Sequence, residues 1–223
     1  MPKAPVQGKG SLKDLAKRQV FKPVLFDAYT QSNTWPEVKP ESIQTLLDLL
    51  EVLLSPIGSY NQIKAESKDK PGSLPDAPEV LDSVTLGFNS TVKALERQVG
   101  KPSKVLVVFV CKADISPTVL TDFFPTLACT SSYGGEPVRL IALPRGSMAK
   151  LSQIVGKPHT GIIGVRAGLK GGESLFSIAN TVAPVTLPWL DENKMAAYMK
   201  PNVKVLATSA PVKPPKTKQQ KKK

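Results

Sequence analysis

The sequence of 223 residues contains few of the side chains from which most catalytic and metal sites are built. It has one histidine and two cysteines, and only 6% of its residues are aromatic. Two cysteines cannot supply a disulfide framework or a four-ligand zinc site, and one histidine cannot form a metal cluster by itself. We therefore expect neither a metal nor a cofactor, and we interpret Cys111 and Cys129, each within an apolar segment, as packing residues.

Long apolar runs are also absent. No stretch approaches the roughly 20 residues that a helix needs to cross a bilayer. The polar residues 1–10 are not followed by the apolar run of a signal peptide. We expect a soluble, intracellular protein that does not contact a membrane.

Catalytic signatures are missing as well. Gly100-Lys101 lacks the upstream glycine of a phosphate-binding P-loop, and no Gly-x-Ser-x-Gly elbow occurs. His159 with Asp114 is the only conceivable acid–base pair, and a lone histidine in a loop of Gly and Pro is usually a surface residue. The sequence indicates a protein that is not an enzyme by itself and has no small-molecule substrate.

Acidic residues are fewer than basic ones, and the excess is unevenly distributed. The chain has 30 Lys and Arg against 18 Asp and Glu, a net charge of +12. Residues 1–22 carry six basic side chains and one acidic, residues 213–223 carry six lysines, and residues 84–170 carry eleven basic and four acidic. Such segments suit a polyanion such as RNA, because cations near phosphates release condensed counterions. The alternative is that the terminal lysines only aid solubility or nuclear import.

The polar and apolar segments predict one folded domain between two polar ends. We expect a basic flexible arm over 1–22 and a single α/β domain over 23–212. A flexible insertion is expected at 61–83, and a disordered Lys-rich tail over 213–223. Within the domain, leucines recur at helical spacing after Glu41, and Pro56 is expected to end that helix.

Helical and strand patterns alternate through the second half of the chain. Six consecutive apolar residues at 105–110 indicate a buried central strand. Alternation of this kind is typical of a sheet covered on both faces. We predict an α/β fold, a three-layer α/β/α sandwich around a central, mostly parallel sheet. The other expected elements are helices over 89–99, after Ser116-Pro117 (with Val119, Leu120, Phe123, Phe124 and Leu127 inward), over 147–155 and over 173–182, and strands at 138–143, 161–166 and 203–207.

The segment 86–97 combines the features of an anion-binding helix start. Asn89 lies where the helix should begin, Lys93 follows one turn later on the same face, and Gly87 lets a ligand approach the free amides. An amide at this position can contact a base edge, while Lys93 and Arg97 hold phosphates. The alternative is a capping Asn followed by a solvated basic face.

This segment and those after it resemble the kink-turn-binding family of archaeal ribosomal proteins, in which Gly-x-Asn-Glu-x-x-Lys opens the RNA-contacting helix. The resemblance extends over residues 84–166 and includes Gly87 to Arg97, Ser116-Pro117 and Val138 to Pro144. Val110-Cys111-Lys112 is typical of the branch found in eukaryotic ribonuclease P and ribonuclease MRP.

Further segments are similar to the fungal Pop-three family of ribonuclease P and MRP subunits. They are Ala16 to Leu25, Trp35-Pro36, Leu140 to Pro144, Pro188-Trp189-Leu190 and Tyr198-x-x-Pro201. The resemblance implies a non-catalytic RNA-binding subunit, nuclear and nucleolar, that supports precursor tRNA 5′-end maturation and rRNA processing. The implied partners are ribonuclease P RNA, ribonuclease MRP RNA and other protein subunits of the same particles.

The resemblance also implies roles for residues of the helix start. Gly87, Asn89 and Lys93 match the family pattern by position. Asn89 is expected at a tandem G·A pair and Lys93 at a backbone phosphate, and Arg97 adds a weaker contact. Ser90 stands where the family has Glu, which contacts the G edge.

A second RNA-contacting segment is implied at the loop 156–161, where the family covers an extruded base with small apolar groups. Here the loop contains Lys157, Pro158 and His159, so its contact is expected to be mainly to phosphate. Two other functions remain open. One is a related-fold protein of another nucleolar or ribosomal particle, and the other is a mainly protein-binding scaffold whose basic arms alone contact RNA.

Overall fold

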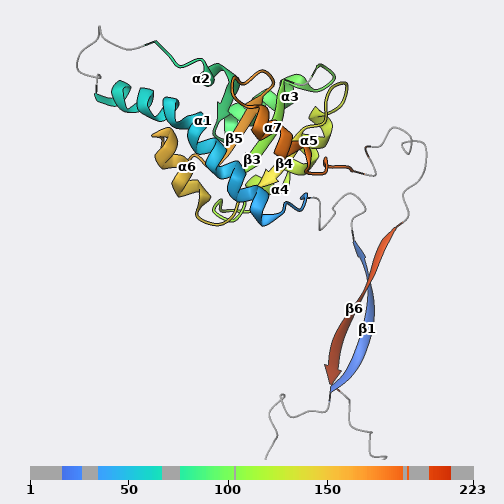
Figure 1. Cartoon of the computed structure of the whole chain (residues 1–223). Helices are drawn as coiled ribbons and strands as arrows, with labels where there is room; N and C mark the ends of the chain where they lie inside the picture. The colour runs from blue at the N-terminus through green and yellow to red at the C-terminus, as the bar shows by residue number, and fades with distance from the viewer. Residues whose placement is uncertain are drawn as a thin grey trace, which may run out of the picture. The chain divides into compact units, whose positions relative to one another are not determined.

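Contacts divide the chain into two units, which are described separately below. The larger spans residues 32–197, and the second is drawn from residues 1–31 and 198–223. The structure is a computed structural model (Figure 1). It describes residues 17–26, 35–66, 76–102, 104–187, 190 and 201–211.

The sheet of the larger unit is mixed rather than mostly parallel. Its strands are β2 (Val84–Leu86), β3 (Val105–Val110), β4 (Arg139–Ala142) and β5 (Ile162–Arg166). The strand order is β2-β5-β3-β4, with β5 antiparallel to both β2 and β3 and only β3 parallel to β4. The expected α/β class is confirmed, and the strand directions are corrected. An apolar run buried on both faces has the same pattern in either direction, so its periodicity does not reveal direction.

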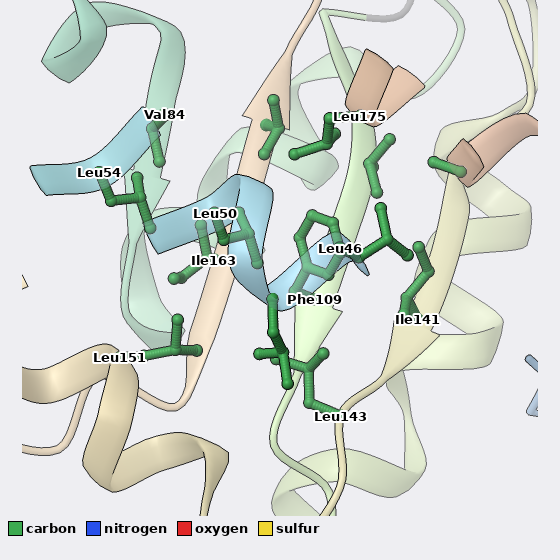
Figure 2. Close-up of a cluster of buried hydrophobic side chains, with 14 of the residues drawn as sticks. Leu46, Leu50, Leu54, Val84, Phe109, Ile141, Leu143, Leu151, Ile163 and Leu175 are labelled. Atoms are coloured by element: carbon green, nitrogen blue, oxygen red, sulfur yellow. The ribbon is translucent and has the colours of Figure 1, made fainter. Parts of the chain in front are cut away.

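Helices cover both faces of the sheet, so the predicted α/β sandwich is confirmed. Residues of β3 alternate between two cores: Val107 and Phe109 pack on one face, Val108 and Val110 on the other. On the first face, Figure 2 shows the leucines of α1 lying over Phe109 and the neighbouring strands. The helices of that face are α1 (Pro40–Glu66), α6 (Ser147–Val155) and α7 (Glu173–Asn180). Those of the second face are α3 (Phe88–Gln98) and α5 (Phe124–Ser131), and the short helix α4 (Val119–Asp122) leads into α5.

The first long helix does not end at Pro56, contrary to the sequence prediction. Proline in a helix interior removes one backbone hydrogen bond, yet α1 continues through Pro56 to Glu66. Beyond the proline, Ile57 and Gly58 are buried, and Gly58 lies so close to α6 that a Cβ would be 1.9 Å from the carbonyl oxygen of Ile154. This packing holds the helix together across the proline.

The expected flexible insertion at 61–83 differs from the described structure at both ends. Residues 61–66 form the last turns of α1, and Val80–Ser83 form the short helix α2. Residues 67–75 lie outside the described part of the chain. Among the described residues, no helix is both long and apolar enough to cross a membrane.

The helix after Ser116-Pro117 is split and turns two of its apolar residues outward. Val119 and Leu120 of α4 are 72% and 39% exposed, so the prediction that both face inward is wrong. Phe124 at the start of α5 is fully buried. The four-residue α4 is too short to present a continuous inner face.

The second unit contains a two-stranded antiparallel ribbon. It pairs β1 (Lys17–Phe26) with β6 (Asn202–Pro211), from Lys17 opposite Pro211 to Phe26 opposite Asn202. The segment 203–207 was expected to complete the layers of the sandwich, and it pairs with β1 instead. The expected arm 1–22 contributes residues 17–22 to this ribbon, and the expected tail 213–223 lies outside the described residues.

Candidate nucleic-acid interface

A basic groove of about 710 Å³ lies beside α3 and the edge strand β2. Six of its fifteen lining residues are Lys or Arg, and among the described residues that line it there is no Asp or Glu. The cations come from four separate parts of the chain: α3, the α3–β3 connection, the α6–β5 loop and the end of β5. They are Lys93, Arg97, Lys101, Lys104, Lys157 and Arg166.

One wall of the groove is a single stripe of α3. Ser90, Lys93 and Arg97 are spaced by three and four residues, which places them on one face over successive turns. Thr91 and Leu95 are fully buried and hold the helix to the sheet. The burial of these two residues turns the cationic stripe outward.

The start of α3 depends on Gly87. This residue is the N-cap and has φ 86° and ψ 171°, a conformation that is essentially restricted to glycine. Its amide donates to the carbonyl oxygen of Ile162 at 2.8 Å, which fixes the beginning of the helix against β5. A Cβ at this position would meet no atom within 4 Å, so the requirement for glycine comes from the backbone angle alone.

Two cations stand at opposite ends of β5. Lys157 precedes this strand and Arg166 ends it. The guanidinium of Arg166 donates through Nη1 to the carbonyl oxygen of Asp82 at 2.9 Å, which orients a half-buried side chain. Since β2 pairs with β5 from Leu86 to Val84, the groove follows the length of this edge.

The floor of the groove is held by buried polar contacts. The hydroxyls of Thr85 on β2 and Thr91 on α3 are 3.0 Å apart and hydrogen-bonded. Gly164 of β5 lies directly beneath, where a Cβ would come within 2.4 Å of the Thr85 hydroxyl. A larger residue at Gly164 would therefore push β2 and α3 away from β5.

The groove contains four of the seven residues predicted from the sequence to contact RNA. Ser90, Lys93, Arg97 and Lys157 all line it, although Lys157 is more than fifty positions away from the other three. The hydroxyl of Ser90 donates to backbone carbonyls of the helix start, at 3.1 Å for that of Gly87.

Gly87, Asn89 and His159 are not among the lining residues. Asn89 is the second residue of α3 and is exposed; within the described part of the chain its side chain makes no hydrogen bond. Because Gly87 is the N-cap, the alternative in which Asn89 caps the helix is contradicted. The amide of Asn89 therefore remains available beside Lys93, one turn further along.

The conceivable acid–base pair does not assemble. Both carboxylate oxygens of Asp114 accept backbone amides at the start of α6, from Gly146 at 2.8 Å and from Met148 at 2.9 Å. His159 is exposed in a turn with φ 57°, and no hydrogen bond joins it to Asp114 among the described residues. Asp114 thus satisfies the free amides of a helix end. The described residues also contain no group of three or more His, Cys, Asp or Glu that could hold a metal ion.

Sequence reasoning missed three cations of the groove. Lys101 and Lys104 lie in the connection between α3 and β3, and Arg166 is the last residue of β5. The one available signal was the excess of basic residues over 84–170, which does not indicate which of them lie together.

The family comparison decides what kind of protein carries this groove. A family model described as RNase P subunit Pop3 matches residues 16–192. The chain belongs to this family. Members of the Pop3 family are subunits of ribonuclease P, a ribonucleoprotein, so this chain is a component of an RNA-containing particle. A search of the curated proteins finds no match to it.

The Pop3 match includes all the residues that build the groove. It spans the complete four-stranded sheet and the helices on both of its faces. It also includes β1, whereas β6 lies beyond its end at residue 192.

Proposed function

We propose that this Pop3-family protein is a non-catalytic RNA-binding subunit of the ribonuclease P and ribonuclease MRP particles. In this role it supports precursor tRNA 5′-end maturation and rRNA processing in the nucleus and nucleolus. The observation that carries the proposal is the groove, in which six cations from four parts of the chain converge without a carboxylate among the described lining residues. Such a surface has the charge of a phosphate-backbone site.

The proposed contacts divide into two kinds. Lys93 on α3 and Lys157 in the α6–β5 loop both line the groove, and they hold phosphates, which position the RNA. Asn89 lies on the neighbouring face of α3 and offers an amide with a donor and an acceptor to a base edge. Gly87 keeps the approach to the helix start free of side-chain atoms.

Other protein subunits of the particles are proposed as further partners. The ribbon exposes Phe21 and Leu25 on β1 and Val203 and Val205 on β6, with exposed fractions of 63%, 72%, 52% and 62%. Leu25 lies opposite Val203, and Phe21 and Val205 share the same face of the ribbon, because residues two apart on a strand point to one side. Exposed apolar groups of this extent favour contact with protein.

Direct RNA binding tests the proposal. The full-length chain is titrated with ribonuclease P RNA, ribonuclease MRP RNA and an unrelated structured RNA over a series of salt concentrations. We expect the double variant Lys93→Gln/Lys157→Gln to bind more weakly to every RNA and to lose about two units of the salt slope, roughly one for each phosphate contact. Asn89→Ala should weaken only the RNAs that contain the recognised motif.

The matched control is the double variant Lys39→Gln/Lys150→Gln. It removes the same charge from exposed lysines that do not line the groove. Equal losses in the two double variants would mean that only net charge matters, and would contradict the assignment of the groove. If the wild-type chain binds neither particle RNA better than the unrelated RNA, the proposed function itself is wrong.

A further inference from the structure

We infer that the groove contains a second phosphate-backbone site at the end remote from the start of α3, formed by Arg97, Lys101, Lys104 and Arg166. This inference rests on the proposed RNA-binding function. It extends the bound RNA beyond the helix start, where Gly87, Asn89 and Lys93 lie. The ligand class is a continuous sugar–phosphate strand.

The two ends of the groove are separated along β5. Lys157 precedes the strand, whose first residue, Ile162, lies beside Gly87, and Arg166 is its last residue. The five residues of β5 rise by about 3.3 Å each, so this edge is roughly 13 Å long from its start to Arg166. The helix α3 runs along the same edge from Ser90 to Gln98. A single small anion cannot bridge the cations at both ends, whereas a polynucleotide backbone can.

The remote cations are not explained by the needs of the fold. Cations near a helix C-terminus can stabilise the helix dipole, and Arg97 in the last turn of α3 fits that role. Lys101 and Lys104 lie beyond the helix and are exposed. With the described residues, neither side chain makes a hydrogen bond or an ion pair. Lys101 and Lys104 therefore add positive charge to the groove that no acidic side chain of the described residues neutralises.

Arg166 is presented to the groove in a fixed orientation. Its Nη1 donates to the carbonyl oxygen of Asp82, the only side-chain hydrogen bond that it makes with the described residues. A guanidinium has five N–H donors, so the remaining ones can serve a phosphate. An arginine that is already oriented loses less side-chain entropy when it binds.

The composition of the lining indicates what part of a nucleic acid the remote site takes. Among the described lining residues there is no aromatic side chain, so the groove provides no platform on which a base could stack. It offers cations, the exposed side chain of Ser90 and apolar groups. Contacts of this kind go to phosphates and sugars and are independent of sequence.

The test compares Lys101→Gln/Lys104→Gln with Lys93→Gln/Lys157→Gln and with the control Lys39→Gln/Lys150→Gln, all in the full-length chain. The probe is ribonuclease P RNA transcribed in vitro. For the remote double variant we expect a salt slope lower by about 1.5 to 2 units, because two phosphate contacts are lost. Chemical footprinting should show a stretch of backbone that loses protection next to, and distinct from, the nucleotides exposed by Asn89→Ala.

The outcomes separate this inference from the proposed function. If the remote variant behaves like the control while Lys93→Gln/Lys157→Gln loses affinity, the remote site is disproved and the proposed function stands. The same holds if both groove variants expose the same nucleotides, because the groove then holds only one contact. Failure of the wild-type chain to bind ribonuclease P RNA in preference to an unrelated RNA overturns both.

Discussion

The side chain of Gln98 forms a two-way hydrogen-bond pair with the backbone of Val105. Its Nε2 donates to the carbonyl oxygen of Val105 at 3.1 Å, and its Oε1 accepts from the amide of Val105 at 2.9 Å. Gln98 is the last residue of α3 and Val105 the first of β3, and both are buried. This pair therefore joins the helix that carries one wall of the groove to the central sheet.

Replacing Gln98 with Leu should destabilise the fold by about 3 kcal/mol, because buried backbone groups of β3 lose their partners at a cost of roughly 1–3 kcal/mol each. Equilibrium urea unfolding measures the change. Gln153→Leu is the control, since Gln153 is exposed on α6. A loss no greater than that of the control would show that water replaces the side chain at little cost. RNA affinity should also fall, because the connection that carries Lys101 and Lys104 is no longer held.

Gly87→Ala should cost about 1–3 kcal/mol of stability through backbone strain alone, since φ is 86° and no atom obstructs the added methyl group. The helix start should shift, and binding to ribonuclease P RNA should weaken beyond the effect on stability. Gly146→Ala is the matched control: its φ is 87°, an added Cβ would meet no atom within 4 Å, and it is the N-cap of α6 rather than of α3. Similar RNA affinities in the two folded variants would remove Gly87 from the proposed interface.

Gly58→Ala should strongly destabilise the layer formed by α1 and α6. The added Cβ would lie 1.9 Å from the carbonyl oxygen of Ile154, so the two helices must separate. Overpacking of this kind costs typically 1–3 kcal/mol, and a contact with backbone places the change at the upper end. Thermal unfolding measures it, with the exposed neighbour Ser59→Ala as the control. RNA binding by the folded fraction should also weaken, because α6, which Gly58 contacts at Ile154, ends two residues before Lys157 of the groove.

Cys111 should remain unreactive until the chain unfolds. Burial, with a smaller contribution from the charge of Asp114, raises the pKa of this thiol from 9.0 to about 12. In the Cys129→Ala variant, a thiol reagent near pH 9 should therefore modify Cys111 at the rate of unfolding rather than at the rate of the free thiol. Rapid modification of the folded chain would contradict this.

The raised pKa of Cys111 also makes the stability of the folded chain depend on pH. Between pH 9 and 12 the unfolded chain releases the Cys111 proton and the folded chain retains it, so the folded state is penalised as the pH rises. The stabilising contribution is complete below pH 9 and is lost as the pH approaches 12. The fall in stability over this range should be smaller in Cys111→Ala than in the wild-type chain, and equal slopes would be inconsistent with the raised pKa.

Local sequence patterns correctly predicted the parts of the fold that depend on one segment at a time. Five of the six apolar residues of β3 are buried, with Leu106 half-buried, and Gly156 ends α6 with φ 68°. The pattern failed where packing against a distant segment decides the outcome. Pro56 should end a helix by its own chemistry, yet the contact of Gly58 with α6 keeps α1 continuous. Apolar Val119 should face inward by spacing, yet the split between α4 and α5 exposes it.

By itself, the sequence determined the α/β class and the helix that carries Lys93 and Arg97 as phosphate contacts, because helical periodicity is a property of neighbouring residues. The tertiary structure alone decided that β5 runs antiparallel beside β2. That arrangement places Lys157 and Arg166 at the two ends of the groove. It also decided that β6 pairs with β1 rather than with the sandwich. Strand pairing depends on hydrogen bonds between segments far apart in the chain, and these leave no signature in either segment alone.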